Sequence, residues 1–130
     1  MLKKNFPIIL MVSALFLFPS CSDDNDFGVL EGSWVRIHQE TNVPIRIEFY
    51  EDSLFTWTPM VITDLHTPSA GYYTYKDGEL TVFDDADCPE IEGVYTIRMS
   101  EFTFDASVSE DECTPRIAGI SGRWTREAEL

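Results

Sequence analysis

The sequence predicts an all-β protein, an eight-stranded antiparallel up-and-down barrel, and three observations support this fold class. After Leu30, β-branched and aromatic residues alternate with polar ones, and helical periodicity is weak. From the second expected strand onward, short and long connections alternate along the chain. Eight strands are enough to close a sheet into a barrel without exposed edges. A flattened two-sheet sandwich has the same local pattern and is the alternative. The expected strands are Ser33–Glu40, Pro44–Tyr50, Ser53–Thr58, Gly71–Lys76, Glu79–Asp84, Gly93–Met99, Glu101–Ala106 and Ile117–Glu127.

The connections between these strands indicate a barrel with one pinched end and one mouth. Successive connections of a meander fall at opposite ends of the sheet, so the tight turns share one end and the long loops share the other. Asp77-Gly78 supplies the positive φ angles of a type I′ turn. The tight turns are expected at Glu51-Asp52, Asp77-Gly78 and Met99-Ser100, and the long loops at Pro59–Ala70, Asp85–Glu92 and Ser107–Arg116.

The N-terminal residues before the barrel have the layout of a secretory signal. Lys3 and Lys4 precede an apolar run from Phe6 to Phe18, which is too short to span a bilayer comfortably, and Ser20 precedes Cys21. A short membrane anchor or a buried helix is the alternative. The segment resembles the signal of a bacterial lipoprotein precursor, although Phe18 and Pro19 depart from the usual pattern before the cysteine. The resemblance implies that residues 1–20 are removed and that Cys21 is acylated, which anchors the chain.

An acidic run, "SDDND", follows Cys21 and divides the anchor from the domain. It resembles the export tag that some Gram-negative bacteria use to send lipoproteins to the outer face of the outer membrane. Such a composition also suits a solvated flexible tether, because it has nothing apolar to bury. We therefore expect a signal peptide at 1–20, a tether at 21–29 and a barrel domain at 30–130, lipid-anchored in the outer membrane and facing the cell exterior. The periplasmic face of that membrane is the alternative.

The charge and cysteine counts limit the partners and the redox state. Without residues 1–20 the chain keeps all 23 acidic but only 7 of its 9 basic residues, a formal charge of −16. This charge argues against binding of nucleic acid and against direct adsorption to an anionic membrane. We expect the protein to contact the membrane only through its lipid and to be a monomer. Once Cys21 is acylated, Cys88 and Cys113 are left, and an exported protein is expected to join them in one disulfide.

Several motifs in the chain resemble the small lipocalin-like (calycin) domains of bacterial secreted proteins, from about Leu30 to Glu127. In "LEGSW", Gly32 and Trp34 match a G-x-W motif, and in "GRWTRE" an arginine is expected to pack over that tryptophan. Both Arg126 and Arg123 qualify, and Arg126 is favoured. A third ordered set consists of Cys88, Gly93, Tyr95, Glu101–Phe104, Asp111, Cys113, Arg116 and Trp124. The resemblance implies a binding barrel with diverse ligands and no shared catalytic residues.

The candidate ligand-binding residues come from the first strand, the aromatic residues and the longest loop. If Trp34 points inward, alternation directs Arg36 and His38 inward as well, where they could bind an anionic head group, unless a bulge shifts the phase. The loop "PMVITDLHTPSA" is unusually apolar and is expected either to cover a cavity as a lid or to pack on the barrel rim. The remaining candidates are Trp57, Tyr73, Met60, Ile62 and His66.

Two function classes follow, because the chain has no G-x-S-x-G, no H-E-x-x-H and no phosphate-cradling glycine loop. We expect a protein without catalytic residues, cofactor or metal. One class is a barrel that binds a small apolar or amphipathic molecule, and the other is a filled barrel whose loops bind another surface protein. The acidic long loops suit a solvated rim better than a Ca²⁺ site, because their spacing matches no EF-hand. The volume of the cavity separates the two classes.

Overall fold

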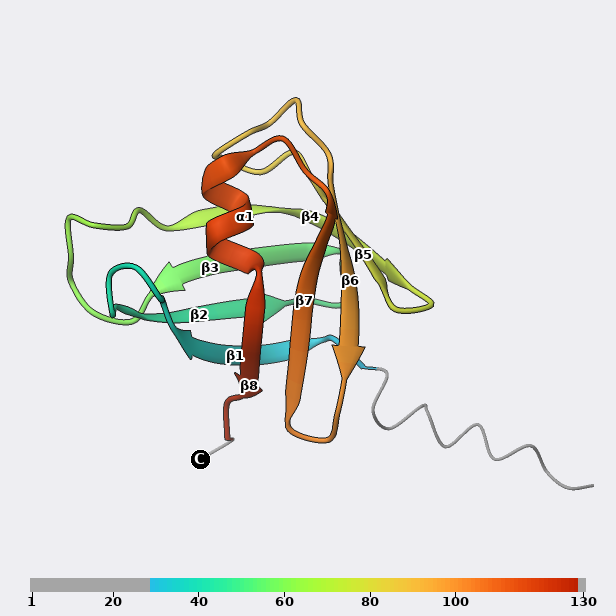
Figure 1. The fold of residues 1–130 in the computed structure, drawn as a ribbon, viewed down its shortest axis with the longest axis horizontal. Helices are drawn as coiled ribbons and strands as arrows, with labels where there is room; N and C mark the ends of the chain where they lie inside the picture. The colour runs from blue at the N-terminus through green and yellow to red at the C-terminus, as the bar shows by residue number, and fades with distance from the viewer. Residues whose placement is uncertain (1–28, 129–130) are drawn as a thin grey trace, which may run out of the picture.

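Residues 29–128 fold as a closed eight-stranded antiparallel barrel with one short helix (Figure 1). The computed structural model describes residues 29–128, so the expected signal peptide, Cys21 and the acidic run lie outside the described residues. The first and last strands pair through Trp34↔Arg126 and Val35↔Thr125, which closes the barrel and excludes the sandwich. The elements are β1 (Gly32–Ile37), β2 (Pro44–Phe49), β3 (Leu54–Pro59), β4 (Ser69–Lys76), β5 (Glu79–Phe83), β6 (Gly93–Met99), β7 (Thr103–Glu110), α1 (Thr114–Ile120) and β8 (Gly122–Arg126).

Short and long connections lie at opposite ends of the barrel, as predicted. Each strand pairs antiparallel with its neighbour in the sequence, so every second connection returns to the same end. The closed end is formed by the turns at 50–53, 77–78 and 100–102, and both Asp77 and Gly78 have positive φ. The mouth is formed by residues 38–43, 60–68, 84–92 and 110–121. Within residues 29–128, no helix has the length and apolar character needed to cross a membrane.

The expected last strand, Ile117–Glu127, is wrong over its first part. Residues Thr114–Ile120 form α1, and β8 begins only at Gly122. Pro115 stands at the start of this helix, where its missing N–H costs nothing and its fixed φ is already helical. The helix directs Gly119 and Ile120 inward over the mouth. The expected loop from Ser107 is also shorter, because β7 continues to Glu110 and pairs there with β6.

Large side chains fill the interior of the barrel. Trp34 and Phe104 meet edge to face with their ring centroids 4.7 Å apart, and Phe104 stacks on Trp124 at 6.1 Å. Phe49 lies edge to face against Tyr73 at 4.9 Å. The aromatic rings therefore occupy the space that a central ligand chamber would need. The largest fully buried side chains are Trp34, Trp124, Tyr95, Phe104, Ile45, Ile47, Leu80, Val82 and Cys113.

The seam between β1 and β8 contains a G-x-W-x-R motif in each strand, "GSWVR" and "GRWTR". The guanidinium of Arg126 lies 4.1 Å from the ring centre of Trp34, as expected, and Arg36 lies 4.7 Å from the ring centre of Trp124. The register pairs Trp34 with Arg126, so the two motifs face each other across an approximate two-fold axis. Each arginine thus covers the tryptophan of the opposite strand.

The residues around each motif repeat the same contacts. Trp34 Nε1 donates to the carbonyl of Leu30, and Trp124 Nε1 donates to the carbonyl of Ile120, both at 2.8 Å. The glycine that opens each motif has φ near +120°, and a Cβ there would lie against the arginine of the other strand. Glycine is needed at both positions because an L side chain rarely adopts this backbone conformation.

Candidate ligand-binding site

A pocket of about 210 Å³ opens at the mouth, between α1 and the loop that follows β3. Drug-sized ligands occupy roughly 300–1,000 Å³, whereas an engineered cavity of about 150 Å³ holds benzene. The pocket therefore suits a molecule with one ring or a short chain. Its walls are Phe55 and Trp57 from β3, Leu65, His66 and Thr67 from the loop, Ser69 from β4, Asp85 and Asp87 from the loop after β5, and Pro115, Arg116, Gly119 and Ile120 from α1.

The apolar wall of the pocket is fixed by a contact between β3 and α1. Trp57 Nε1 donates to the carbonyl of Gly119 at 3.0 Å. A Cβ on Gly119 would lie 3.4 Å from that same nitrogen, an ordinary van der Waals distance, so this part of the helix packs directly against the indole. The indole is therefore held in one orientation, with Phe55 beside it as the second aromatic wall.

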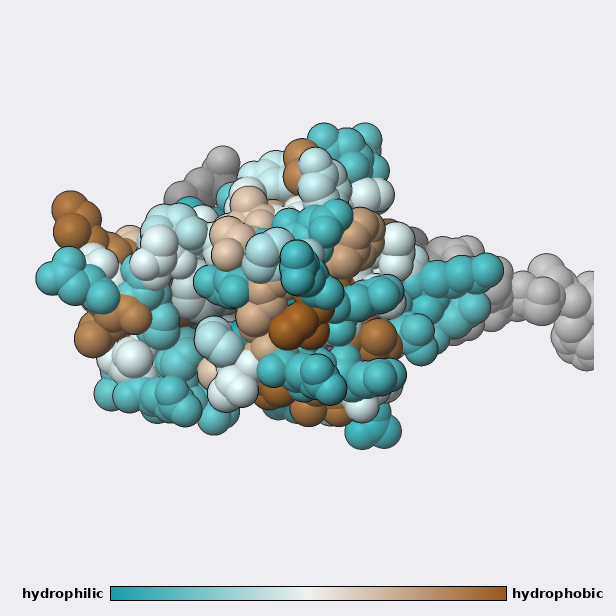
Figure 2. Space-filling view, turned by 90° about the horizontal axis from the view of Figure 1, so that it is seen from above, coloured by the Kyte–Doolittle hydropathy of each residue, from teal (hydrophilic) through white to brown (hydrophobic). Residues whose placement is uncertain are grey.

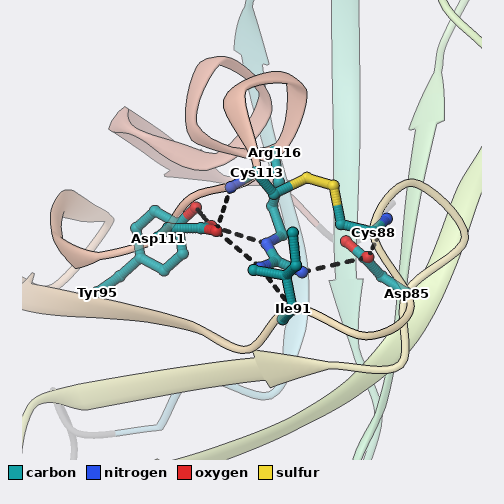
Figure 3. Close-up of polar contacts among 7 residues, drawn as sticks. All are labelled: Asp85, Cys88, Ile91, Tyr95, Asp111, Cys113 and Arg116. Carbon is teal, nitrogen blue, oxygen red and sulfur yellow. Dashed lines mark hydrogen bonds and ion pairs between the residues drawn. A yellow bond between two sulfur atoms is a disulfide. The ribbon is translucent and has the colours of Figure 1, made fainter.

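Arg116 of α1 holds the polar side of the mouth together (Figure 3). Its Nε and Nη2 donate to the two carboxylate oxygens of Asp111, each at 2.7 Å, and Nη2 also donates to the carbonyl of Ile91. Its Nη1 lies 3.2 Å from Oδ1 of Asp85. All three charged side chains are at least 97% buried. Burial alone would lower the pKa of Arg116, but Asp111 and Asp85 raise it above its usual value.

The carboxylate of Asp111 accepts four hydrogen bonds, two on each oxygen, and two of the four come from Arg116. The hydroxyl of Tyr95 donates to Oδ2, and the backbone N–H of Cys113 donates to Oδ1 at 2.8 Å. Gly93 lies against the same carboxylate and leaves no room for a side chain. Burial acts to raise the pKa of Asp111, but the hydrogen bonds from Arg116, Tyr95 and Cys113 and the charge of Arg116 lower it below its ordinary 3.8.

Acid is expected to destabilise the fold through Asp111. Its folded pKa is lowered, so the unfolded chain takes up the proton first as the pH falls. The stability that this carboxylate supplies is complete above its unfolded value near pH 4 and is lost as the pH falls through the lowered pKa. Urea midpoints measured from pH 5 to pH 2.5 should fall steadily. Asp111→Asn should flatten this part of the profile, and an unchanged slope in the variant would contradict the assignment.

The disulfide expected between Cys88 and Cys113 is present and joins the two acidic loops of the mouth. The Cα atoms lie 6.1 Å apart, and 25 residues separate the two cysteines in the sequence. Cys88 also donates its backbone N–H to Oδ1 of Asp85 at 2.9 Å. The bridge therefore fixes Asp85 and the start of α1 relative to each other, and with them two walls of the pocket.

Removing the disulfide is expected to lower the free energy of unfolding by about 3 kcal/mol, mainly by releasing the unfolded chain from a closed loop. The comparison uses Cys21→Ser as the parent chain, with Cys88→Ser and Cys113→Ser added together, and denaturation in urea. In the parent, a thiol reagent should modify no cysteine until the chain is reduced. Two reactive thiols in the unreduced parent would refute the bridge.

Ser69 is a buried polar side chain that has no hydrogen-bond partner among residues 29–128. It is 9% exposed, and its Oγ makes no hydrogen bond although it is shielded from solvent. Buried hydroxyls are nearly always paired, so an unpaired one in a pocket wall is unusual. Arg116 Nη1, in the same wall, has the ion pair with Asp85 but no hydrogen bond. A ligand with a polar group could satisfy the hydroxyl of Ser69, whereas Nη1 of Arg116 already faces the carboxylate of Asp85.

Two histidines pack against each other beside the pocket, and His66 of this pair lines it. The rings of His38 and His66 lie 4.4 Å apart, and His66 is also 5.4 Å from the ring of Trp57. His66 Nε2 is 2.7 Å from the hydroxyl of Thr41. His38 is 4% exposed, and burial, followed by the charges of His66 and Arg36, lowers its pKa. His66 is thus held beside Trp57 by the loop that follows β1.

The structure brings only some of the candidate residues together. Trp57 and His66 line the pocket. Tyr73 lies at the closed end, where its hydroxyl donates to the carbonyl of Tyr50 at 2.7 Å and burial raises its pKa to about 12. His38 lies behind His66 and lines a separate, smaller hollow.

Arg36 does not offer its guanidinium to an anionic head group. Its Nη2 donates to the carbonyls of Ala118 at 2.6 Å and Gly119 at 3.0 Å, and its Nη1 donates to the carbonyl of Ser121. These carbonyls belong to the last turn of α1, which the helix itself leaves without partners. Burial lowers the pKa of Arg36 to about 10. Its role is to terminate the helix and to cover Trp124.

The apolar loop after β3 does not cover the pocket as a lid. Leu65 lines the pocket, but Met60, Val61 and Ile62 do not, and Ile62 is fully exposed. Figure 2 shows hydrophobic side chains at the left edge of the molecule, where this loop lies in Figure 1. The tip of the loop is therefore an exposed apolar surface beside the mouth.

Most residues of the pocket are not among the candidates from the sequence, and Gly119, Ile120 and Ser69 show why. Gly119 and Ile120 were expected in a strand, and only Thr114-Pro115 signals a helix start. Ser69 has no recognisable signal, because its isolation depends on the packing around it. Among residues 29–128, no three His, Cys, Asp or Glu side chains are placed to hold a metal ion, since Asp85 and Asp111 bind Arg116 instead.

Comparison with other proteins adds no family assignment to this geometry. No family model, curated protein or solved structure matches the chain.

Proposed function

We propose that the protein is a non-catalytic binding protein that holds a small amphipathic molecule in the mouth pocket. The observation that carries this proposal is the unpartnered, buried Oγ of Ser69 in a pocket that Trp57 and Phe55 line with aromatic surface. Aromatic walls with a few convergent polar groups are typical of small-molecule sites. The volume of about 210 Å³ limits the bound part of the ligand to one ring or a short chain.

The site differs in position from that of an open lipocalin-like chamber. The interior below the mouth is filled by the buried rings of Trp34, Phe104 and Trp124. A ligand must therefore bind above them, between α1 and the loop after β3. We therefore expect a shallow site in which the ligand exchanges rapidly with solvent and is not enclosed by the barrel.

Nuclear magnetic resonance of the three indole N–H groups tests the site directly, with benzyl alcohol as a single-ring amphipathic probe. The Trp57 signal should shift on titration, whereas the signals of the buried Trp34 and Trp124 should not. Ser69→Ala should weaken binding about tenfold, the value of one hydrogen bond, and should leave stability unchanged because the hydroxyl has no partner. Equal shifts of all three indoles would place the ligand elsewhere.

The second part of the proposal is that a lipid on Cys21 carries the barrel at the outer membrane, facing the cell exterior. The apolar run, the cysteine and the acidic run after it support this location. Val29 lies at the closed end of the barrel, so a tether there would leave the mouth facing away from the membrane. Metabolic labelling with palmitate should mark the chain, and Cys21→Ser should remove the label. Labelling of the variant would exclude this anchor.

A protein-interaction module is the second candidate function, favoured by the apolar tip of the loop after β3. Met60, Val61 and Ile62 are between 41% and 107% exposed, and a surface of this kind typically contacts another protein. Ile62→Asp should leave folding and probe binding at Trp57 unchanged. It should remove any cross-link to a surface protein that the parent chain forms in its own membrane, and an identical cross-link in the variant would exclude the loop.

A further inference from the structure

We propose that the mouth pocket selects a protonated amine, with the ammonium group beside Ser69 and Asp85 and the apolar part against Trp57. This inference rests on the proposed function, because it names the chemical class that the same pocket prefers. Three observations carry it: the negative charge of the mouth, the engagement of the arginines that reach it, and the unpartnered hydroxyl in the wall.

The mouth has a large excess of negative charge. Its four segments, 38–43, 60–68, 84–92 and 110–121, contain one basic side chain apart from histidine, Arg116. Arg36 reaches them from β1, and its guanidinium is bonded to carbonyls at the end of α1. Carboxylates so concentrated attract cations and repel anions before contact. The acidic residues of these segments are Glu40, Asp64, Asp84, Asp85, Asp87, Glu90, Glu92, Glu110, Asp111 and Glu112.

Arg116 does not provide a site for an anion. Asp111 binds two of its nitrogens and Asp85 lies against the third, so its charge is already balanced inside the protein. Asp85 and Asp87 both line the pocket, which leaves the walls net negative when Arg116 and Asp111 are counted with them. A carboxylate or phosphate ligand would have to displace a buried ion pair to find a cation.

Ser69 and Asp85 both line the pocket, on two segments that are packed against each other. The loop after β5 is joined to the start of β4 by the backbone N–H of Ala86, which donates to the carbonyl of Ala70 at 3.1 Å. Gly71 packs so closely on Asp85 that a Cβ there would lie 2.7 Å from the Cβ of Asp85. An ammonium group has three donors and no acceptor, which suits a pocket wall that contains both an unpaired hydroxyl oxygen and a carboxylate.

The aromatic wall adds an attraction that a neutral ligand lacks. The face of an indole attracts a cation more strongly than the ring of phenylalanine does, and most strongly where water is excluded. Trp57 is 9% exposed and is held in place by Gly119. An amine with a short apolar body can therefore contact carboxylate, hydroxyl and ring at once.

A set of probes of nearly equal size tests this inference: benzylamine, which is protonated at neutral pH, benzyl alcohol and benzoate. The shift of the Trp57 indole N–H is followed at pH 7 in low salt with the chain as it exists. Benzylamine should bind about tenfold more tightly than benzyl alcohol, and benzoate should not bind. Added NaCl should weaken the binding of benzylamine and leave the affinity for benzyl alcohol unchanged.

Two variants complete the test. Asp87→Asn removes a carboxylate from the pocket wall that is not part of the buried Arg116 cluster. It should lower the affinity for benzylamine severalfold and leave the affinity for benzyl alcohol unchanged. Asp52→Asn, at the closed end, is the matched control and should change neither. Equal affinity for benzylamine and benzyl alcohol, or tightest binding of benzoate, would overturn the amine preference and leave the pocket as a site. If none of the three probes shifts Trp57, the proposed function fails and the amine preference fails with it.

Discussion

Replacing Arg116 with methionine is expected to lower the free energy of unfolding by about 3–5 kcal/mol, the usual cost of removing one partner of a buried ion pair. Methionine keeps the unbranched stem of arginine as far as the position of Nε but lacks Cζ and the two Nη atoms, so a small cavity adds to the loss. The main loss comes from Asp111, which is fully buried and would lose both bidentate hydrogen bonds, and from Asp85, which is 3% exposed. Both carboxylates would then be charged without a counterion.

The unfolding midpoint in urea at pH 7 measures this loss, and two further variants show its origin. Adding Asp111→Asn and Asp85→Asn to Arg116→Met removes the stranded charges, so the triple variant should regain part of the stability. Arg123→Met is the matched control: Arg123 pairs with Asp105 at the surface, where its side chain is 69% exposed, and should change stability by under about 1 kcal/mol. A loss below about 1 kcal/mol for Arg116→Met would show that the cluster is not essential to the fold.

The barrel could be predicted from the sequence because its main signals are local. Alternating strands and the alternation of tight and long connections depend on local chemistry, such as the positive φ of Asp77-Gly78, and the structure has them as expected. Cys88 and Cys113 could be paired because the meander brings their loops to one end. These predictions needed only periodicity, turn residues and the count of cysteines.

The site could be predicted only in part, because it depends on contacts between distant segments. Arg36 was expected to face a ligand from the phase of its strand, yet the unforeseen helix α1 presents its last carbonyls to that guanidinium. One error therefore produced the other: a helix mistaken for a strand left Arg36 without a partner. Ser69 is notable because its hydroxyl has no hydrogen-bond partner among the described residues. No local sequence pattern predicts this, because it depends on how distant segments pack.

Replacing Trp34 or Trp124 with alanine is expected to cost about 3–5 kcal/mol in each case, the usual range for a large aromatic side chain in a core. Both indoles are fully buried, and each loses the hydrogen bond to a carbonyl four residues earlier. The approximate two-fold relation between the G-x-W-x-R motifs gives them equivalent surroundings, so the two losses should be similar. Phe102→Ala is the control, because this ring is 63% exposed and should contribute little.

The arginines that cover these rings make the two-fold relation testable pair by pair. Double-mutant cycles for Trp34 with Arg126, and for Trp124 with Arg36, should each give a coupling of about 0.5–2 kcal/mol, the range of a cation–π contact. The crossed pair of Trp34 with Arg36 should give less, because each arginine lies over the tryptophan of the opposite strand. Urea unfolding at pH 7 measures all the variants. A crossed coupling free energy as large as the direct ones would contradict this pairing. It would mean that the four side chains of the seam interact as one cluster and not as two separate tryptophan–arginine pairs.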